Sequence, residues 1–104
     1  MKIDALLINE KDNVVTALRN INTNENVIVR IQEKAFKLLI KDKIPFGHKF
    51  AKKDIKKGED IYKYGEIIGR ATQLISKGSY AHIHNIESLR GRGDIERNKL
   101  KNEI

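Results

Sequence analysis

The sequence lacks cysteine and tryptophan and has a single proline among its 104 residues. The absence of cysteine excludes disulfide bonds, zinc sites built on cysteine, and thiol catalysis. No apolar run approaches the ~18 residues that a membrane-spanning helix needs. The charges scattered through residues 1–12 do not fit a signal peptide. The length corresponds to one small domain, and we expect a soluble, cytoplasmic protein without a membrane partner.

Aromatic residues are also scarce, at 6% of the chain, although the net charge is +7. A basic protein can bind nucleic acid. Basic and acidic residues are nevertheless interleaved, with 6 and 5 in residues 1–40, 8 and 4 in residues 41–63, and 7 and 5 in residues 64–104. Spread charge and few aromatic side chains do not favour a base-stacking surface. We interpret the charge as a lysine-rich solvated surface and do not expect a nucleic-acid partner.

β-Branched residues dominate the apolar side chains, with 16 Ile and 4 Val against 8 Leu. This composition favours strands. Residues 5–8 and 14–18 are apolar and flank a polar turn, which predicts a hairpin. Residues 27–31 and 36–40 predict two further strands.

Glycines divide the second half of the chain into short pieces. We expect strands there at residues 48–51, 61–64, 67–68 and 82–86. This pattern indicates a compact, mainly β fold of short strands, and residues 54–58 predict one helical turn that ends at a glycine. We find no internal repeat and no linker. Residues 1–94 are therefore assigned to one domain, and residues 95–104 to a charged tail or a short helix.

The segment around Gly47 combines a permissive backbone with two donor side chains. Gly47 lets the backbone approach a ligand, and His48 and Lys49 follow it directly. A lysine suits a carboxylate or a phosphate as a point charge. Taken alone, such a segment is more often an ordinary turn before a strand.

Two other basic segments have a similar composition. In a strand, Tyr62 and Tyr64 share one face and Lys63 takes the other, and alone this pattern is more often an ordinary strand end. Residues 90–94 place two arginines between small residues and could grip an anion or a neighbouring subunit. A flexible basic loop is the plainer interpretation of that segment.

Residues 82–85, His-Ile-His-Asn, carry the most informative pattern. In a strand, the imidazoles of His82 and His84 point the same way, while Ile83 faces the core and Asn85 takes the Ile83 side. Such a pair can share a metal ion, or one histidine can act as acid or base while the other orients it. Two ligands do not complete a metal site, so a third would come from His48, a carboxylate or another chain. Two exposed strand histidines are the alternative.

Five blocks of the sequence, taken in order, resemble a known family. They are residues 13–18 (NVVTAL), 44–51 (IPFGHKFA), 54–61 (DIKKGEDI), 63–72 (KYGEIIGRAT), and Gly78 with residues 82–85 (HIHN). In this order and spacing they resemble the N-terminal SAF-type module of the altronate and galactarate dehydratase family. The alpha subunit of sulfolactate sulfo-lyase belongs to the same group.

The resemblance implies a β-clip fold, in which short strands fold over on themselves with one or two short helical turns. It implies a lyase that removes a proton next to a carboxylate and expels water or sulfite, which leaves an enol that becomes a 2-keto acid. It also implies a divalent metal, Fe2+, with which the dehydratases are associated. In single-chain members a large catalytic region follows the module. We therefore expect a separate large catalytic dehydratase subunit as the partner.

The resemblance also implies the residues of the site. The catalytic residues it implies are His48, His82 and His84, of which His82 and His84 would hold the metal. The substrate-binding residues it implies are Gly47, Lys49, Lys63, Tyr64 and Asn85. Such a lyase must stabilise the charge on an enolate and protonate a departing hydroxyl. Lys49 or Lys63 would then hold the substrate carboxylate, and His82 or His84 would be metal ligand, acid or base.

We therefore expect the small subunit of an altronate-type dehydratase, which eliminates water from a hexonate to give a 2-keto-3-deoxy acid. One alternative is the alpha subunit of (2R)-sulfolactate sulfo-lyase, and another is a carbohydrate-binding SAF module without chemistry. Both lyase substrates are anionic hydroxy acids, and the sequence does not separate them. Self-association as a homo-oligomer stays open.

Overall fold

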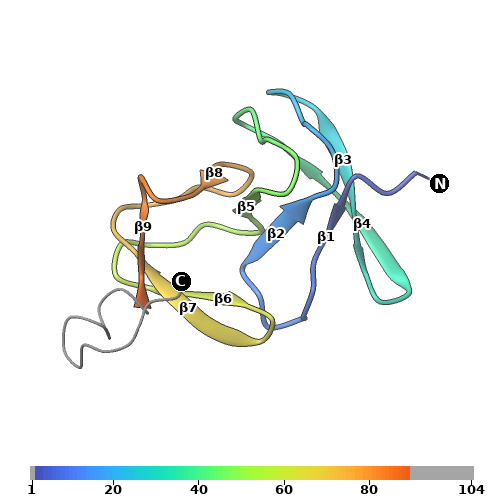
Figure 1. Cartoon of the computed structure of the whole chain (residues 1–104). Coiled ribbons are helices and arrows are strands. Elements are labelled where there is room, and N and C mark those ends of the chain that lie inside the picture. Colours follow the sequence, from blue (N-terminus) through green and yellow to red (C-terminus); the bar gives the residue numbers. More distant parts are fainter. Residues whose placement is uncertain (1, 90–104) are drawn as a thin grey trace.

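The computed structural model describes residues 2–89, and these residues form nine short strands (Figure 1). The strands are β1 (Ala5–Leu6), β2 (Val14–Ala17), β3 (Asn26–Ile31), β4 (Lys34–Leu39), β5 (Lys49–Ala51), β6 (Asp60–Lys63), β7 (Glu66–Ala71), β8 (Tyr80–Ala81) and β9 (Ile86–Ser88). A six-stranded sheet has the order β4-β3-β1-β2-β5-β8, and a three-stranded sheet has the order β6-β7-β9. The predicted compact, mainly β fold is confirmed and is consistent with a β-clip. The predictions for residues 90–94 and 95–104 lie outside the described residues.

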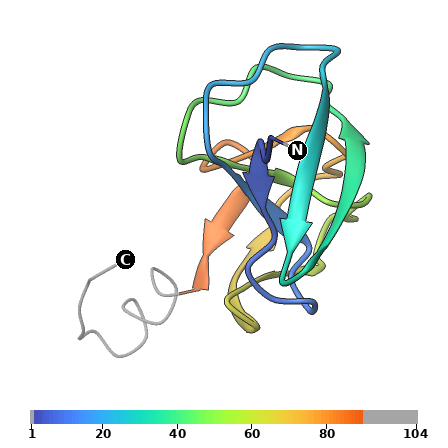
Figure 2. The ribbon, with the colours of Figure 1, turned by 90° about the vertical axis from the view of Figure 1, so that its right-hand side faces the viewer.

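The six-stranded sheet follows from the apolar runs of the first half of the chain. β1 pairs antiparallel with β2, so the predicted hairpin is confirmed. β3 lies parallel to β1 and forms a long hairpin with β4, which confirms the two further strands (Figure 2). Every second residue of β3 is buried (Val27, Val29 and Ile31). This alternation arises because successive side chains of a strand point to opposite faces.

A four-residue turn recurs before β3, β5, β6 and β8. In residues 22–25, 45–48, 56–59 and 76–79, the amide of the fourth residue donates to the carbonyl oxygen of the first. The third residue of each turn (Asn24, Gly47, Gly58 or Gly78) is left-handed, with φ between 71° and 90°, which is typical of type II turns. A buried isoleucine precedes each turn, and these isoleucines bridge in pairs, Ile21 with Ile44 and Ile55 with Ile75. The statement that the sequence holds no internal repeat is therefore wrong.

The helical turn predicted at residues 54–58 is also wrong, because this segment belongs to the repeated turn. Ile55 pairs with Ile75 across an antiparallel bridge, and Gly58 takes the left-handed third position. A glycine after a basic stretch can end a helix or form a tight turn. The local pattern therefore could not distinguish the two.

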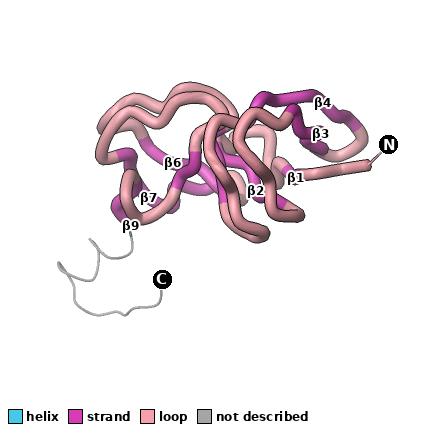
Figure 3. The backbone as a smooth tube through the Cα atoms, turned by 90° about the horizontal axis from the view of Figure 1, so that it is seen from above, coloured by secondary structure: helices cyan, strands magenta, loops and turns pink. Residues whose placement is uncertain are grey.

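Two groups of buried side chains stabilise the fold. The larger lies within the six-stranded sheet and includes Phe50, Val15 and Val29. The smaller joins the two sheets: Val14, Ala51 and Ala81 pack with Ile55, Ile61, Ala71 and Ile75. Seen from above, β6, β7 and β9 lie at the opposite end of the molecule from β3 and β4 (Figure 3). No membrane-spanning helix is found in the described part of the chain.

Candidate functional site

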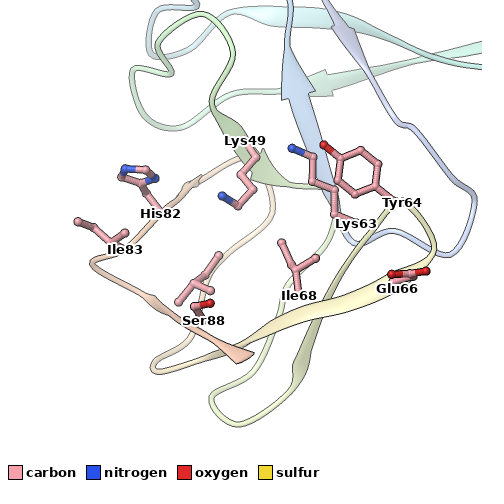
Figure 4. Close-up of a pocket in the computed structure, with 9 residues that line it drawn as sticks. Lys49, Lys63, Tyr64, Glu66, Ile68, His82, Ile83 and Ser88 are labelled. Carbon is pink, nitrogen blue, oxygen red and sulfur yellow. The ribbon is translucent and has the colours of Figure 1, made fainter. Parts of the chain in front are cut away.

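An open pocket of about 450 Å³ is lined by residues from both sheets (Figure 4). β5 contributes Lys49, β6 contributes Lys63, and Tyr64 follows β6 directly, while His82 comes from the segment after β8. The remaining lining residues are Ile68, Ile83, Ile86, Glu66 and Ser88. The volume falls within the ~300–1,000 Å³ of small-molecule sites. The structure thus brings together four of the residues proposed for the site from the sequence.

Lys49 and Lys63 present two positive charges to this pocket. Neither lysine forms an ion pair with another residue of the described part of the chain. Burial, and then the charge of Lys63, lower the pKa of Lys49 below its ordinary value. Glu66 is the one acidic residue among the described residues that line the pocket, and it forms no ion pair with either lysine. Two half-buried cations against a single carboxylate favour the binding of an anion such as a carboxylate.

Tyr64 reaches the same pocket as Lys63 because the chain turns at this residue. β6 and β7 are joined by the two-residue loop of Tyr64 and Gly65, and both residues are left-handed, with φ of 61° and 75°. The predicted placement of Lys63 on the opposite face from Tyr64 is therefore wrong. The Nζ atom of Lys63 lies 5.1 Å from the centre of the Tyr64 ring, which is a cation–π contact.

The strand predicted at residues 82–86 is wrong for its first four residues, which form a turn. The amide of Asn85 donates to the carbonyl oxygen of His82 at 3.0 Å, and β9 begins only at Ile86. Ile83 is 82% exposed at this turn instead of facing the core. The alternation of His, Ile, His and Asn resembles a strand, but the hydrogen bonds of a buried side chain fix the turn instead.

That buried side chain is Asn85, which is 5% exposed. Its Oδ1 atom accepts the amide N–H of His82 at 2.9 Å, and its Nδ2 atom donates to the carbonyl oxygen of Tyr80 at 2.9 Å. Asn85 is thus placed beneath the histidine turn and supports His82, and it is not among the residues that line the pocket. Gly47 lies in the turn before β5 and is likewise not among the lining residues.

Three histidines surround Tyr80, a residue that the sequence analysis did not single out. The phenolic oxygen of Tyr80 lies 2.6 Å from Nδ1 of His48. Its ring stacks on His82, with centroids 5.4 Å apart, and its centroid lies 5.5 Å from that of His84. The repeated turn could have pointed to Tyr80, because Tyr80 directly follows the fourth of these turns just as the pocket residue Lys49 directly follows the second. That signal depends on recognising the repeat first.

Of the three histidines, His82 lines the pocket. Burial lowers the pKa of His82, and the charges of Lys49, His48 and His84 lower it further. The imidazole is therefore neutral at neutral pH, and in this form it can accept a proton from a ligand in the pocket. The ring of His48 lies next to that of His82, with centroids 4.9 Å apart, and His84 is exposed.

The described residues do not fit a resident metal ion by themselves. Residues 2–89 contain no group of three or more His, Asp or Glu side chains that could hold one, whereas zinc and iron take at least about three protein ligands. The ammonium group of Lys49 also repels the charge of His82 and would repel a metal cation there. The assignment of a metal to His82 and His84 stays a prediction that needs further ligands.

The similarity to known proteins extends over almost all of the residues that the structure describes. The family described as the altronate/galactarate dehydratase SAF domain matches residues 3–89. Altronate dehydratase of Bacillus subtilis (strain 168) is 41% identical over 81 residues, which are 78% of this chain and 16% of that protein. Subunit alpha of (2R)-sulfolactate sulfo-lyase from Paracoccus pantotrophus is 36% identical over 63 residues, 61% of this chain and 94% of that subunit. The corresponding subunit of Chromohalobacter salexigens is 39% identical over 59 residues, 57% of this chain and 63% of that subunit.

Proposed function

This chain belongs to the altronate/galactarate dehydratase SAF domain family, and on this premise we propose that it forms the sugar-acid-binding part of a lyase whose site a larger catalytic subunit completes. The observation that carries the proposal is the pocket in which Lys49 and Lys63, which form no ion pair within residues 2–89, lie beside a neutral His82. The substrate class is an anionic hydroxy acid, and altronate is the first candidate.

The two lysines supply the charge that such a reaction requires. When a proton leaves the carbon beside a carboxylate, negative charge builds up on the carboxylate oxygens. Ammonium groups already fixed near those oxygens stabilise that charge, and partial burial of Lys49 reduces its screening by water. Tyr64 brings a phenolic hydroxyl to the same pocket, where it can bond to a substrate hydroxyl.

His82 is the group of this chain best placed to take the proton. Its neutral imidazole accepts the proton from the carbon next to the carboxylate. The bond from the next carbon to its hydroxyl then breaks, and the hydroxyl leaves with a proton as water. The resulting enol rearranges to a 2-keto-3-deoxy acid. Within this chain, His48 and His84 are the candidates for giving the proton to the leaving hydroxyl.

A larger partner is part of the proposal because the pocket is open and because this chain spans a small part of a dehydratase. It covers 16% of the Bacillus subtilis enzyme. It covers 94% of the Paracoccus pantotrophus sulfo-lyase subunit, and this observation favours a second candidate function, the alpha subunit of a sulfolactate sulfo-lyase. The cytoplasmic location and the self-association stay predictions.

A paired turnover assay tests the proposal. The chain is purified with the large subunit that it binds, identified by mass, and the complex receives altronate or (2R)-sulfolactate. Release of a 2-keto acid from altronate supports the dehydratase, and release of sulfite from sulfolactate supports the second candidate. Binding of sugar acids without turnover of either substrate would instead indicate a non-catalytic carbohydrate-binding module.

A further inference from the structure

Asp12 is a buried carboxylate that the proposed reaction does not use. It is 1% exposed and forms no ion pair within residues 2–89. Its oxygens accept three backbone amides instead: Oδ1 accepts from Gly65 at 2.8 Å, and Oδ2 accepts from Tyr64 at 3.0 Å and from Asn9 at 3.1 Å. Such bonds replace the water that a buried carboxylate loses. Two of the three bonds go to the turn that carries Tyr64 into the pocket.

Tyr64 occupies a turn position that does not suit its side chain. Two-residue hairpin loops with both residues left-handed favour Asn-Gly or Asp-Gly, and a bulky residue at positive φ is strained. Tyr64 is 60% exposed, so burial does not explain its presence. Its ring lines the pocket beside Lys63. A strained, exposed aromatic residue at a pocket points to contact with a ligand.

The residues next to Asp12 in the chain contact the rest of the β6–β7 hairpin. Asn13 accepts the amide of Tyr62 at 2.8 Å and donates to the carbonyl oxygen of Asp60 at 2.9 Å. A Cβ atom on Gly65 would lie 2.8 Å from Nδ2 of Asn9, so the turn packs closely on the segment that leads to Asp12. Residues 9–13, between β1 and β2 of the large sheet, therefore hold the β6–β7 turn of the small sheet.

We propose that Asp12 is a positioning residue of the pocket: it holds the left-handed turn of Tyr64 and Gly65 so that Tyr64 and Lys63 face the ligand. The inference rests on the proposed function in taking that ligand to be an anionic hydroxy acid. Asp12 does not line the pocket and acts through the two amides. An asparagine at this position would have the same size, but its NH₂ group would face N–H donors and could not accept from them.

Three variants of the full chain test the proposal: Asp12→Asn, Tyr64→Asn and the double variant. The affinity for altronate is measured by calorimetric titration, and backbone amide exchange is measured without ligand. Asp12→Asn should weaken altronate binding about fivefold or more in the wild-type background and less than about twofold in the Tyr64→Asn background, since asparagine forms this turn unaided. Exchange of the Tyr64 and Gly65 amides should accelerate at least about tenfold in Asp12→Asn.

Asp54→Asn is the matched control, because Asp54 also accepts a backbone amide, that of Lys77 at 2.8 Å, in an exposed turn outside the pocket lining. This variant should change neither the affinity for altronate nor the amide exchange at Tyr64.

An equal loss of affinity from Asp12→Asn in both backgrounds, or unchanged exchange at Tyr64 and Gly65, would overturn the proposal. If Asp12→Asn alone does not fold, folding of the double variant supports the proposal and its failure overturns it. A wild-type chain that does not bind altronate contradicts the proposed function, and the exchange data then decide the role of Asp12.

Discussion

The Nδ1 atom of His48 lies 2.6 Å from the phenolic oxygen of Tyr80, and Pro45 leaves the histidine free for this contact. In two of the other repeated turns, the fourth position, which His48 occupies here, is taken by Glu25 or Glu59. Each glutamate accepts the amide N–H of the first residue of its turn at 2.8 Å. Pro45 has no N–H to offer. In two of the repeated turns the fourth side chain therefore caps its own turn, whereas in the turn of residues 45–48 the side chain of His48 is available to contact Tyr80.

The repeated turn allows a comparison of two glycines with the same backbone conformation. Gly47 and Gly78 have φ of 83° and 84°, but a Cβ atom on Gly78 would lie 2.2 Å from the carbonyl oxygen of Leu39, whereas one on Gly47 meets nothing within 4 Å. Gly47→Ala should lower the free energy of unfolding by ~1 kcal/mol from backbone strain. Gly78→Ala should lower it by ~3 kcal/mol or more, because the end of β4 must move. Urea denaturation measures both values, and equal losses would contradict this account of the turn.

Asn85 is predicted to matter more for stability than a surface asparagine with a similar bond. Asn85→Ala leaves the partly buried amide of His82 and the carbonyl oxygen of Tyr80 without their partner. We expect a loss of ~2 kcal/mol in the free energy of unfolding. Asn20 accepts the amide of Phe46 in an exposed turn, so Asn20→Ala should lose less than ~1 kcal/mol. Thermal unfolding of both variants decides the matter, and a larger effect at Asn20 would refute the role given to Asn85.

Much of the large sheet could be predicted from the sequence, because its pattern is local. The apolar runs at residues 5–8, 14–18 and 27–31 lie close together in the chain and alternate or cluster as strands do. Two strands of the small sheet were also predicted, since residues 61–64 and 67–68 overlap β6 and β7. The connecting turns were harder to predict, because the same glycine pattern fits a helix end and a turn, as at residues 54–58. Only the pairing of Ile55 with Ile75 decides between them.

Four of the residues proposed from the sequence line one pocket, but the geometry that brings them together was not predicted. Lys49 and Lys63 were named because a lysine suits a carboxylate or a phosphate, and His82 was named because of its spacing from His84 and the family resemblance. The roles of Tyr80 and Asp12 arise from contacts between segments that lie far apart in the sequence, such as the pairing of β5 with β8. No local pattern points to Asp12, and Tyr80 can be selected only after the repeated turn has been recognised.

The lowered pKa of His82 predicts a fall in stability at mildly acidic pH. The unfolded chain takes up a proton at the ordinary value of 6.5, before the folded protein does so. The free energy of unfolding should therefore decrease as the pH falls through 6.5 towards the folded pKa. His82→Gln should show a smaller decrease between about pH 7 and about pH 5, above the range in which carboxylates titrate. Denaturation at several pH values measures this, and identical pH profiles would contradict it.

Lys49 is predicted to lower stability while it supports anion binding. Lys49→Met removes a half-buried charge that Lys63 repels. We expect the free energy of unfolding to rise by ~0.5–1 kcal/mol, together with a loss of affinity for altronate of about tenfold or more. Lys37→Met, on the exposed side of β4, should change neither quantity appreciably. A destabilised Lys49→Met protein with unchanged affinity would show that the lysine is structural.

The most direct test of the central claim is a titration of the isotope-labelled chain with altronate, followed by nuclear magnetic resonance. We predict saturable shifts of the backbone signals of Lys49, Lys63, Tyr64 and His82 and of their neighbours. Lys63→Met should weaken the affinity about tenfold or more, and Lys37→Met should leave it unchanged. Shifts confined to another surface, or an affinity that Lys63→Met does not alter, would contradict the account of this pocket as the sugar-acid site.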